Sequence, residues 1–477
     1  MKNNIYRLII FGFLLITAIS CKRDILEQTP KDQYSDVTVW TDIKLAEAYL
    51  LNNYEQLKIG FSPFMLTALT DEARFTHGGA DAYMQGQISA SSLGPFANTA
   101  GQPSLIPEWD QYFKNIQELN KFLANIDRVE EAASAVDKEI VKERIVVLKG
   151  EALFLRAYSY GQLLRLYGGV PIFSEPAELG KGYENVVRNS FEETVDFITA
   201  DCDAAVALLP DPAAAKMGRA NKGVALALKS RILLFAASDL SADGNAQNKY
   251  VGYENPDRVA LWTKAKNAAK AVMDAGYYSL ADFGAPDKAA VANRFYEFFR
   301  AKDLSDPEVI WGKMYNTALN YGHTNNQFND GNGWNGYSDN AATQELVNDF
   351  QMEDGSDFHD HFILNANGYY INTSSVFTSA NPYDNREPRF YASILFDSAV
   401  WKPREASLQG IDPLGVYDRR TRITIQGGVE TFKRFGLDTR QGPRSPDNGG
   451  FTGYLMKKTL DHEVITGVRL NDNAWIE

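Results

Sequence analysis

Apolar residues recur every three or four positions from Val141 to Leu166, which is the spacing of one face of an α-helix. Gly168 and Gly169 follow where this pattern stops. Shorter stripes of the same period predict further helices over residues 43–57, 109–126, 190–209, 223–237 and 262–275. The chain is therefore predicted to be mainly α, with helix pairs that form a tetratricopeptide-like helical superhelix.

The second half of the chain has a different texture from about Tyr315 onward. It is rich in Asn, Gly, Tyr and Asp and has few periodic segments. We expect loops here, with a short helix over residues 344–350 and small strands at 421–425 and 453–457. Two long irregular segments, residues 77–107 and 316–340, are aromatic, and such segments in a compact protein usually serve a function.

The N-terminus has the pattern of a secreted lipoprotein. Lys2 and Arg7 precede an apolar run, and small residues lead to Cys21. This predicts a signal peptide over residues 1–20, a lipidated Cys21 and a tether over residues 21–36. The alternative is a plain signal peptide that happens to contain a cysteine. Cys202 lies on an apolar helical stripe, so we assign no disulfide.

Composition and motifs exclude several classes of function. The net charge of −13 argues against nucleic acid as a partner. Gly331–Gly336 matches the dinucleotide fingerprint but lacks the strand and helix that this motif requires, so we expect no cofactor. Asp357–His361 can be read as the seed of a metal site or as a solvated loop. Two acidic pairs, Asp71 with Glu72 and Asp354 with Asp357, can be read as glycosidase carboxylates or as surface charges.

Several runs resemble the SusD/RagB family of outer-membrane lipoproteins. The most diagnostic is Gly150–Tyr158, continued by Leu166–Pro171, and similar runs follow in the same order at 110–123, 218–223, 343–355 and 385–390. The resemblance implies a helical superhelix that supports a loop-rich half containing small β elements. It also implies a non-catalytic nutrient receptor on the cell surface, with a SusC-like TonB-dependent transporter as partner and a glycan or peptide as ligand.

We expect the SusD-like helical scaffold to cover residues 37–314 and the loop-rich C-terminal region to cover 315–477. The segment Trp475–Glu477 resembles a point after which family members usually continue into further helices. Either the region is truncated at this point or the fold lacks its last helical packing, which would leave an apolar surface uncovered.

Sugars present an apolar C–H face and a ring of hydroxyls, so a glycan receptor needs aromatic platforms beside hydrogen-bonding groups. We predict that the 316–340 loop is the main platform, with Trp334 its most important residue and Tyr337, Tyr321 and Asn335 in support. The 77–107 loop adds Tyr83 and Phe96. The alternative is that these aromatics pack the loops onto the scaffold. A surface glycoside hydrolase and a purely structural helical scaffold are the competing functions.

Overall fold

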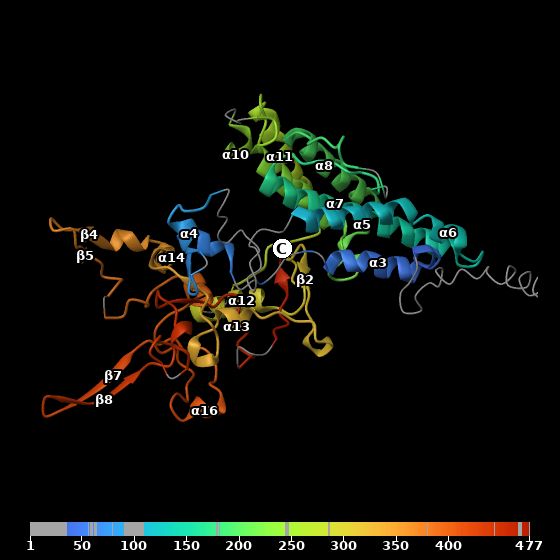
Figure 1. Ribbon diagram of the computed structural model, residues 1–477. Coiled ribbons are helices and arrows are strands. Elements are labelled where there is room, and N and C mark those ends of the chain that lie inside the picture. Colours follow the sequence, from blue (N-terminus) through green and yellow to red (C-terminus); the bar gives the residue numbers. More distant parts are fainter. Residues whose placement is uncertain are drawn as a thin grey trace, which may run out of the picture.

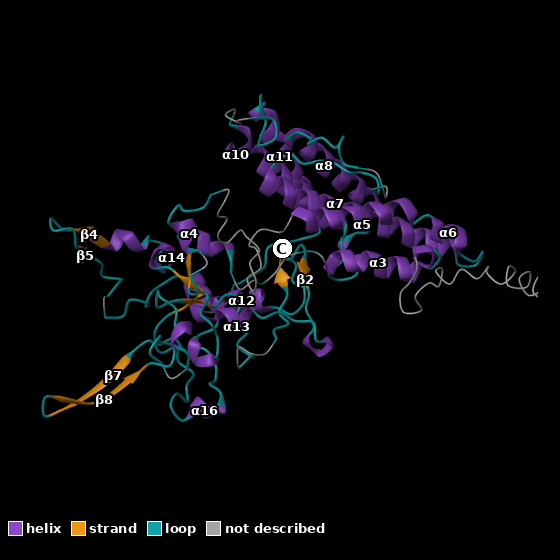
Figure 2. Cartoon of the chain, in the orientation of Figure 1, coloured by secondary structure: helices purple, strands orange, loops and turns teal. Residues whose placement is uncertain are grey.

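The computed structural model describes residues 36–55, 57, 61, 64–78, 80–89, 109–177, 180, 182–243, 248–284, 287–378, 380–442, 444–465 and 470–476. The predicted signal peptide, Cys21, the tether up to residue 35 and Phe96 lie outside these residues. The described part divides into a helical half and an irregular half (Figures 1 and 2).

The helical half contains the six helices that the sequence predicts. These helices pack in chain order: α5 contacts α7, α7 contacts α8, α8 contacts α9 and α9 contacts α11. Ser190 and Glu193 form a capping box at the start of α8. The helices of this half are α2 (Asp36–Val39), α3 (Ile43–Glu55), α5 (Trp109–Asn125), α6 (Arg128–Ala132), α7 (Lys138–Tyr167), α8 (Phe191–Leu208), α9 (Lys222–Ala237), α10 (Asp239–Ala242) and α11 (Arg258–Asp274).

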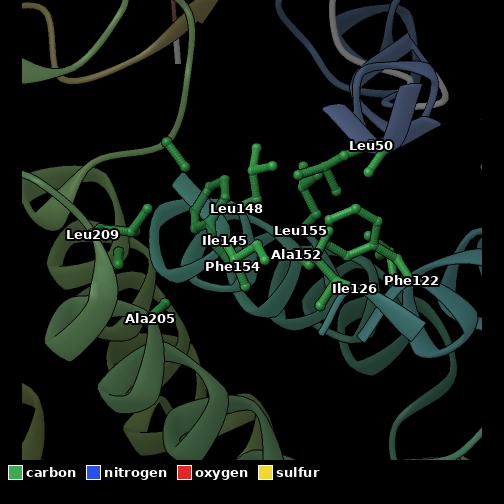
Figure 3. Close-up of a cluster of buried hydrophobic side chains, with 14 of the residues drawn as sticks. Leu50, Phe122, Ile126, Ile145, Leu148, Ala152, Phe154, Leu155, Ala205 and Leu209 are labelled. Atoms are coloured by element: carbon green, nitrogen blue, oxygen red, sulfur yellow. The ribbon is translucent and has the colours of Figure 1, made fainter. Parts of the chain in front are cut away.

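The core of this half joins α3, α5, α7 and α8 through their apolar stripes. Leu50, Phe122, Leu148 and Leu155 are fully buried in one hydrophobic cluster (Figure 3). The spacing that predicted each helix therefore also sets the face it buries. No helix among the described residues is long and apolar enough to cross a membrane.

Two glycines end α7 by permitting close backbone approach. Gly168 has φ +72°, and a Cβ there would lie 2.1 Å from the carbonyl oxygen of Tyr250. A Cβ on Gly169 would lie 2.3 Å from the carbonyl oxygen of Asn189. Both positions exclude a side chain, so the chain can turn from α7 toward α8.

The irregular half consists of loops, short helices and paired strands. Its helices are α4 (Asp81–Met84), α12 (Lys288–Arg300), α13 (Asn325–Asn329), α14 (Gln344–Asp349), α15 (Pro388–Ser393) and α16 (Ala406–Gln409). The antiparallel strand pairs are β1 (Ala73–Phe75) with β3 (Asn340–Ala342), β2 (Gly312–Lys313) with β10 (Trp475–Ile476), β4 (Phe362–Leu364) with β5 (Tyr370–Asn372), β6 (Ile394–Leu395) with β9 (Leu455–Met456), and β7 (Thr421–Gln426) with β8 (Val429–Phe435). The mainly helical fold with a loop-rich half and small strands is confirmed.

Segments from both sides of the predicted boundary at residue 315 pack together. Helix α12, for which the sequence shows no clear periodicity, buries Tyr296 in one cluster with Trp401 and Tyr417 of the later region. Strand β1 pairs with β3, which lies about 270 residues further along the chain. The division at residue 315 stays a prediction.

Candidate functional site

Trp334 is a core residue, which corrects the prediction that its ring is an exposed platform. Its side chain is 0% exposed, and Nε1 donates to the carbonyl oxygens of Lys402 and Pro403 at 3.3 and 3.2 Å. The Arg404 guanidinium lies 3.4 Å from the ring centre. Arg404 in turn pairs with Asp438, Nη2 to Oδ2, at 2.7 Å. A ring enclosed in this way cannot stack on a ligand.

The other residues predicted around Trp334 do not form one site. Asn335 is half-buried and donates to Glu405 Oε1 at 2.9 Å. Tyr321 stacks on Tyr315 at 5.5 Å between ring centres, and its hydroxyl donates to Glu55 Oε2 at 2.6 Å. Tyr321 therefore faces the end of α3, and the 316–340 segment folds through α13 and two short 3₁₀ turns rather than forming one open loop.

The β1–β3 pair brings the start of the first predicted loop beside the end of the second. His77 lies edge-on to Tyr337, with ring centres 6.0 Å apart, and its Nδ1 hydrogen-bonds Asp339. The hydrogen bond to Asp339 raises the pKa of His77, against the opposing effect of burial. Tyr337 is half-buried, and Tyr83 on α4 is 41% exposed. Both remain predicted ligand contacts.

The acidic and histidine candidates occupy exposed turns. Asp354 accepts from the backbone and hydroxyl of Ser356, and that hydroxyl also contacts His361. Asp71 and Glu72 are exposed. Within the described ranges, no group of three His, Cys, Asp or Glu side chains is placed to hold a metal ion.

A cavity of about 320 Å³ lies where the first turns of α5 meet the segment after α7. This volume falls within the usual range of small-molecule sites, which is about 300 to 1,000 Å³. Trp109 is 40% exposed, and Tyr183 is 66% exposed. We call this the Trp109 cavity, and its walls are Trp109, Phe113, Gln117, Pro171, Phe173, Ala177, Tyr183 and Val186.

The aromatic rings of the Trp109 cavity pack on one another at fixed angles. The Trp109 ring centre lies 4.6 Å from that of Phe113 and 5.0 Å from that of Tyr167, which it meets edge-on. Phe113 meets Phe173 edge-on at 5.8 Å. Because each ring is held by another, the exposed face of Trp109 is positioned before any ligand arrives.

Polar side chains of α5 and α7 hold the segment after α7 in place against α5. Asn120 Nδ2 donates to the carbonyl oxygen of Phe173 at 2.9 Å, and Gln117 Oε1 accepts from the backbone of Ala177 at 2.8 Å. The Tyr160 hydroxyl accepts from the backbone N–H of Phe173 at 2.7 Å. Burial raises the pKa of Tyr160 to about 12, so the hydroxyl keeps its proton.

The cavity offers what a saccharide ring requires. Trp109 presents an aromatic face to C–H groups, while the Gln117 amide N–H groups, which donate to no described residue, can bind hydroxyls. The periodicity over residues 109–126 predicts a helix that includes Trp109 and Phe113, but it does not indicate that both residues line a cavity. Two aromatic rings in the first turns of a helix, directly after a long irregular segment, were the available signal.

Comparison with known families and structures agrees with the fold. A family model described as "Starch-binding associating with outer membrane" matches residues 26–234, and a model described as "SusD family" matches residues 307–476. A separate comparison with curated proteins found no match.

Solved structures of the same fold cover most of the chain. A SusD-like protein from Bacteroides fragilis has a TM-score of 0.64 at 21% identity, covering 94% of this chain and 75% of the other. A SusD-like carbohydrate-binding protein from the same organism has 0.60 at 17%, covering 92% and 71%. A laminarin-binding SusD-like protein has 0.53 at 16%, covering 91% and 77%. These identities establish the fold alone, and with the two family models, which match both halves, they show that the chain belongs to the SusD/RagB family.

Proposed function

We propose that this protein is a non-catalytic receptor that captures a glycan at the outer membrane and delivers it to a SusC-like TonB-dependent transporter. The Trp109 cavity carries the proposal, because it combines an exposed, preorganised indole with the Gln117 N–H groups, which donate to no described residue, in a space of suitable size. The descriptions of the family models and of two related structures, which mention starch, carbohydrate and laminarin, support a glycan as the ligand class.

This proposal is tested by measuring glycan retention by two single tryptophan variants. Trp109→Ala should lower affinity for the glycan that the wild type retains by about tenfold or more, because one stacking face is lost. Trp262→Ala is the matched control, since Trp262 is 43% exposed on α11, away from the cavity. Equal loss of binding in both variants, or none in either, would contradict the assignment of the cavity.

The competing functions predict different results from the same purified protein. A glycosidase would release products from a polysaccharide, and substitution of Asp71 or Asp354 would abolish that release. A structural scaffold would capture proteins but retain no glycan. A receptor retains glycan without product and co-purifies with its transporter.

The membrane attachment rests on Cys21, which lies outside the described residues. A diacyl anchor supplies strong membrane affinity. Cys21→Ala should therefore move the protein from the membrane to the soluble fraction in cells that lack the transporter. A variant that stays membrane-bound in those cells would contradict lipid anchoring.

A further inference from the structure

The exposed Phe451 ring carries two guanidinium groups from separate segments. Arg74, on β1, places Cζ 4.5 Å from the ring centre, and Arg440 places Cζ 4.3 Å from it. The two cations are therefore no further apart than the sum of these distances. Phe451 itself is 47% exposed, and Arg74 is exposed as well. We call Arg74, Arg440 and Phe451 the Phe451 cluster.

Hydrogen bonds and close backbone packing fix the segments that bear Arg440 and Phe451. Arg419 Nη1 donates to the carbonyl oxygen of Asp438 at 2.6 Å and also to that of Gly449, so one guanidinium joins both segments. A Cβ on Gly449 would lie 2.3 Å from the backbone nitrogen of Arg440, so the two segments touch without a side chain between them. The cluster is thus preorganised rather than a chance meeting of long side chains.

Among the described residues, most N–H donors of Arg74 and Arg440 have no hydrogen-bond acceptor. In the part of the chain that the structure describes, no carboxylate oxygen lies within 4.0 Å of a nitrogen of Arg74 or Arg440. Arg440 Nη1 donates a long hydrogen bond of 3.4 Å to the carbonyl oxygen of Asp447. Like charges held around one ring repel each other, and an anion bound between them removes that repulsion.

Further polar side chains lie near the Phe451 cluster. His77 Nε2 lies 3.3 Å from Asn448 Oδ1, in the same loop as Phe451. Two carboxylates are near: Asp339 is buried and hydrogen-bonded to His77, and Asp447 interacts with His77. Neither carboxylate forms an ion pair with Arg74 or Arg440 in the described structure, so both guanidinium groups can pair with an external anion although the net charge of the chain is −13.

We infer that the Phe451 cluster is a binding site for the anionic groups of an acidic glycan, carboxylates of uronic acids or sulfate esters. Guanidinium groups bind both kinds of oxyanion through paired N–H donors. This inference rests on the proposed function in taking the ligand as a glycan, and it adds that the ligand carries negative charge and is held outside the Trp109 cavity.

Binding of matched charged and neutral glycans tests the inference. The probes are polygalacturonate with its carboxyl-reduced form, and dextran sulfate with dextran. Arg74→Gln and Arg440→Gln should each weaken binding of the charged probes by about tenfold, and the double variant by more, with neutral probes unaffected. Wild-type affinity for charged probes should also fall as salt rises. Arg165→Gln, an exposed arginine on α7, is the control and should change nothing.

The outcomes separate this inference from the proposed function. Loss with polygalacturonate alone identifies carboxylates as the ligand groups, and loss with dextran sulfate alone identifies sulfates. Equal affinity for charged and neutral probes, or unchanged binding by a double variant of wild-type melting temperature, overturns the inference while glycan capture stands. Failure to retain glycans of either kind, across a panel, overturns both.

Discussion

Glu151 on α7 and Arg219, in the segment before α9, form a buried ion pair with Oε2 and Nε 2.6 Å apart. Both belong to sequence runs that resemble the family, so the two runs meet in space. The Tyr54 hydroxyl of α3 donates to the same carboxylate oxygen at 2.7 Å. Burial raises the pKa of Glu151, although Arg219 favours its charged form. The pair therefore links three elements of the helical half.

Replacing one member of this pair should lower the free energy of unfolding far more than replacing both members. Arg219→Met leaves a carboxylate buried without its cation and should lower the free energy of unfolding by about 3 to 5 kcal/mol. The double variant Glu151→Leu with Arg219→Met should recover most of that loss. Chemical denaturation measures both, with Lys229→Met as control, since its pair with the exposed Asp203 should contribute under about 1 kcal/mol. A single variant as stable as the control would contradict the assignment.

The helical half could be predicted because its information is local. The stripes that ended at residues 57, 126 and 209 correspond to α3, α5 and α8, and the Ser190 capping box is present as expected. Helix α12 escaped prediction because it buries only Ala292 and Tyr296, too few positions to set a period. The pairing of β1 with β3 could not be predicted, because strands of three residues are too short for their sequence to specify a distant partner.

The burial of Trp334 could not be predicted from the sequence, because the burial of a loop residue depends on residues that are distant in the chain. The glycines around Trp334 permit the burial of its indole by allowing close approach. A Cβ on Gly336 would lie 2.2 Å from the carbonyl oxygen of Asp330, and one on Gly333 would lie 2.3 Å from Arg404 Nη1. Arg404, which covers the ring, is 70 residues away in the sequence, and no local sequence pattern indicates this contact.

Trp334 should therefore contribute to stability and not to ligand binding. Trp334→Ala removes a fully buried indole and leaves Arg404 without its aromatic contact, so it should cost about 3 to 5 kcal/mol of unfolding free energy. Trp334→Phe should cost less because part of the volume is kept. The folded fraction of either variant should bind glycan as the wild type does. Loss of binding at unchanged melting temperature would restore the platform role.

Glu47 should make the stability of the helical half depend on pH in the acid range. Burial opposes its charge, but Arg144, Arg219 and Lys216 outweigh burial and lower its pKa from 4.5 to about 2. A depressed pKa stabilises the folded state above pH 4.5, and this contribution is lost as pH falls toward 2. Glu47→Gln should thus be less stable than wild type by about 2 kcal/mol at pH 6, with the difference vanishing near pH 2.

Urea denaturation at several pH values measures this difference. Glu143→Gln, which alters an exposed carboxylate on α7, is the control and should track the wild type throughout. A wild-type advantage over Glu47→Gln that stays constant from pH 6 to pH 2 would show that the carboxylate charge is not the cause.

Gly449 should be a positioning residue for the Phe451 cluster. Its backbone conformation suits any residue, so Gly449→Ala acts only through space, where the new Cβ would meet the nitrogen and Cα of Arg440 at 2.3 and 2.6 Å. The two segments must then separate. This weakens the hydrogen bonds by which Arg419 joins them and increases the distance between Phe451 and the Arg440 guanidinium. Affinity for charged glycans should fall about as far as in Arg440→Gln, while neutral glycans still bind at the Trp109 cavity. Gly410→Ala is the matched control, because a Cβ there has open space. Isothermal titration with both probe types measures the effect, and full affinity for charged glycans in Gly449→Ala would mean that the cluster does not depend on this contact.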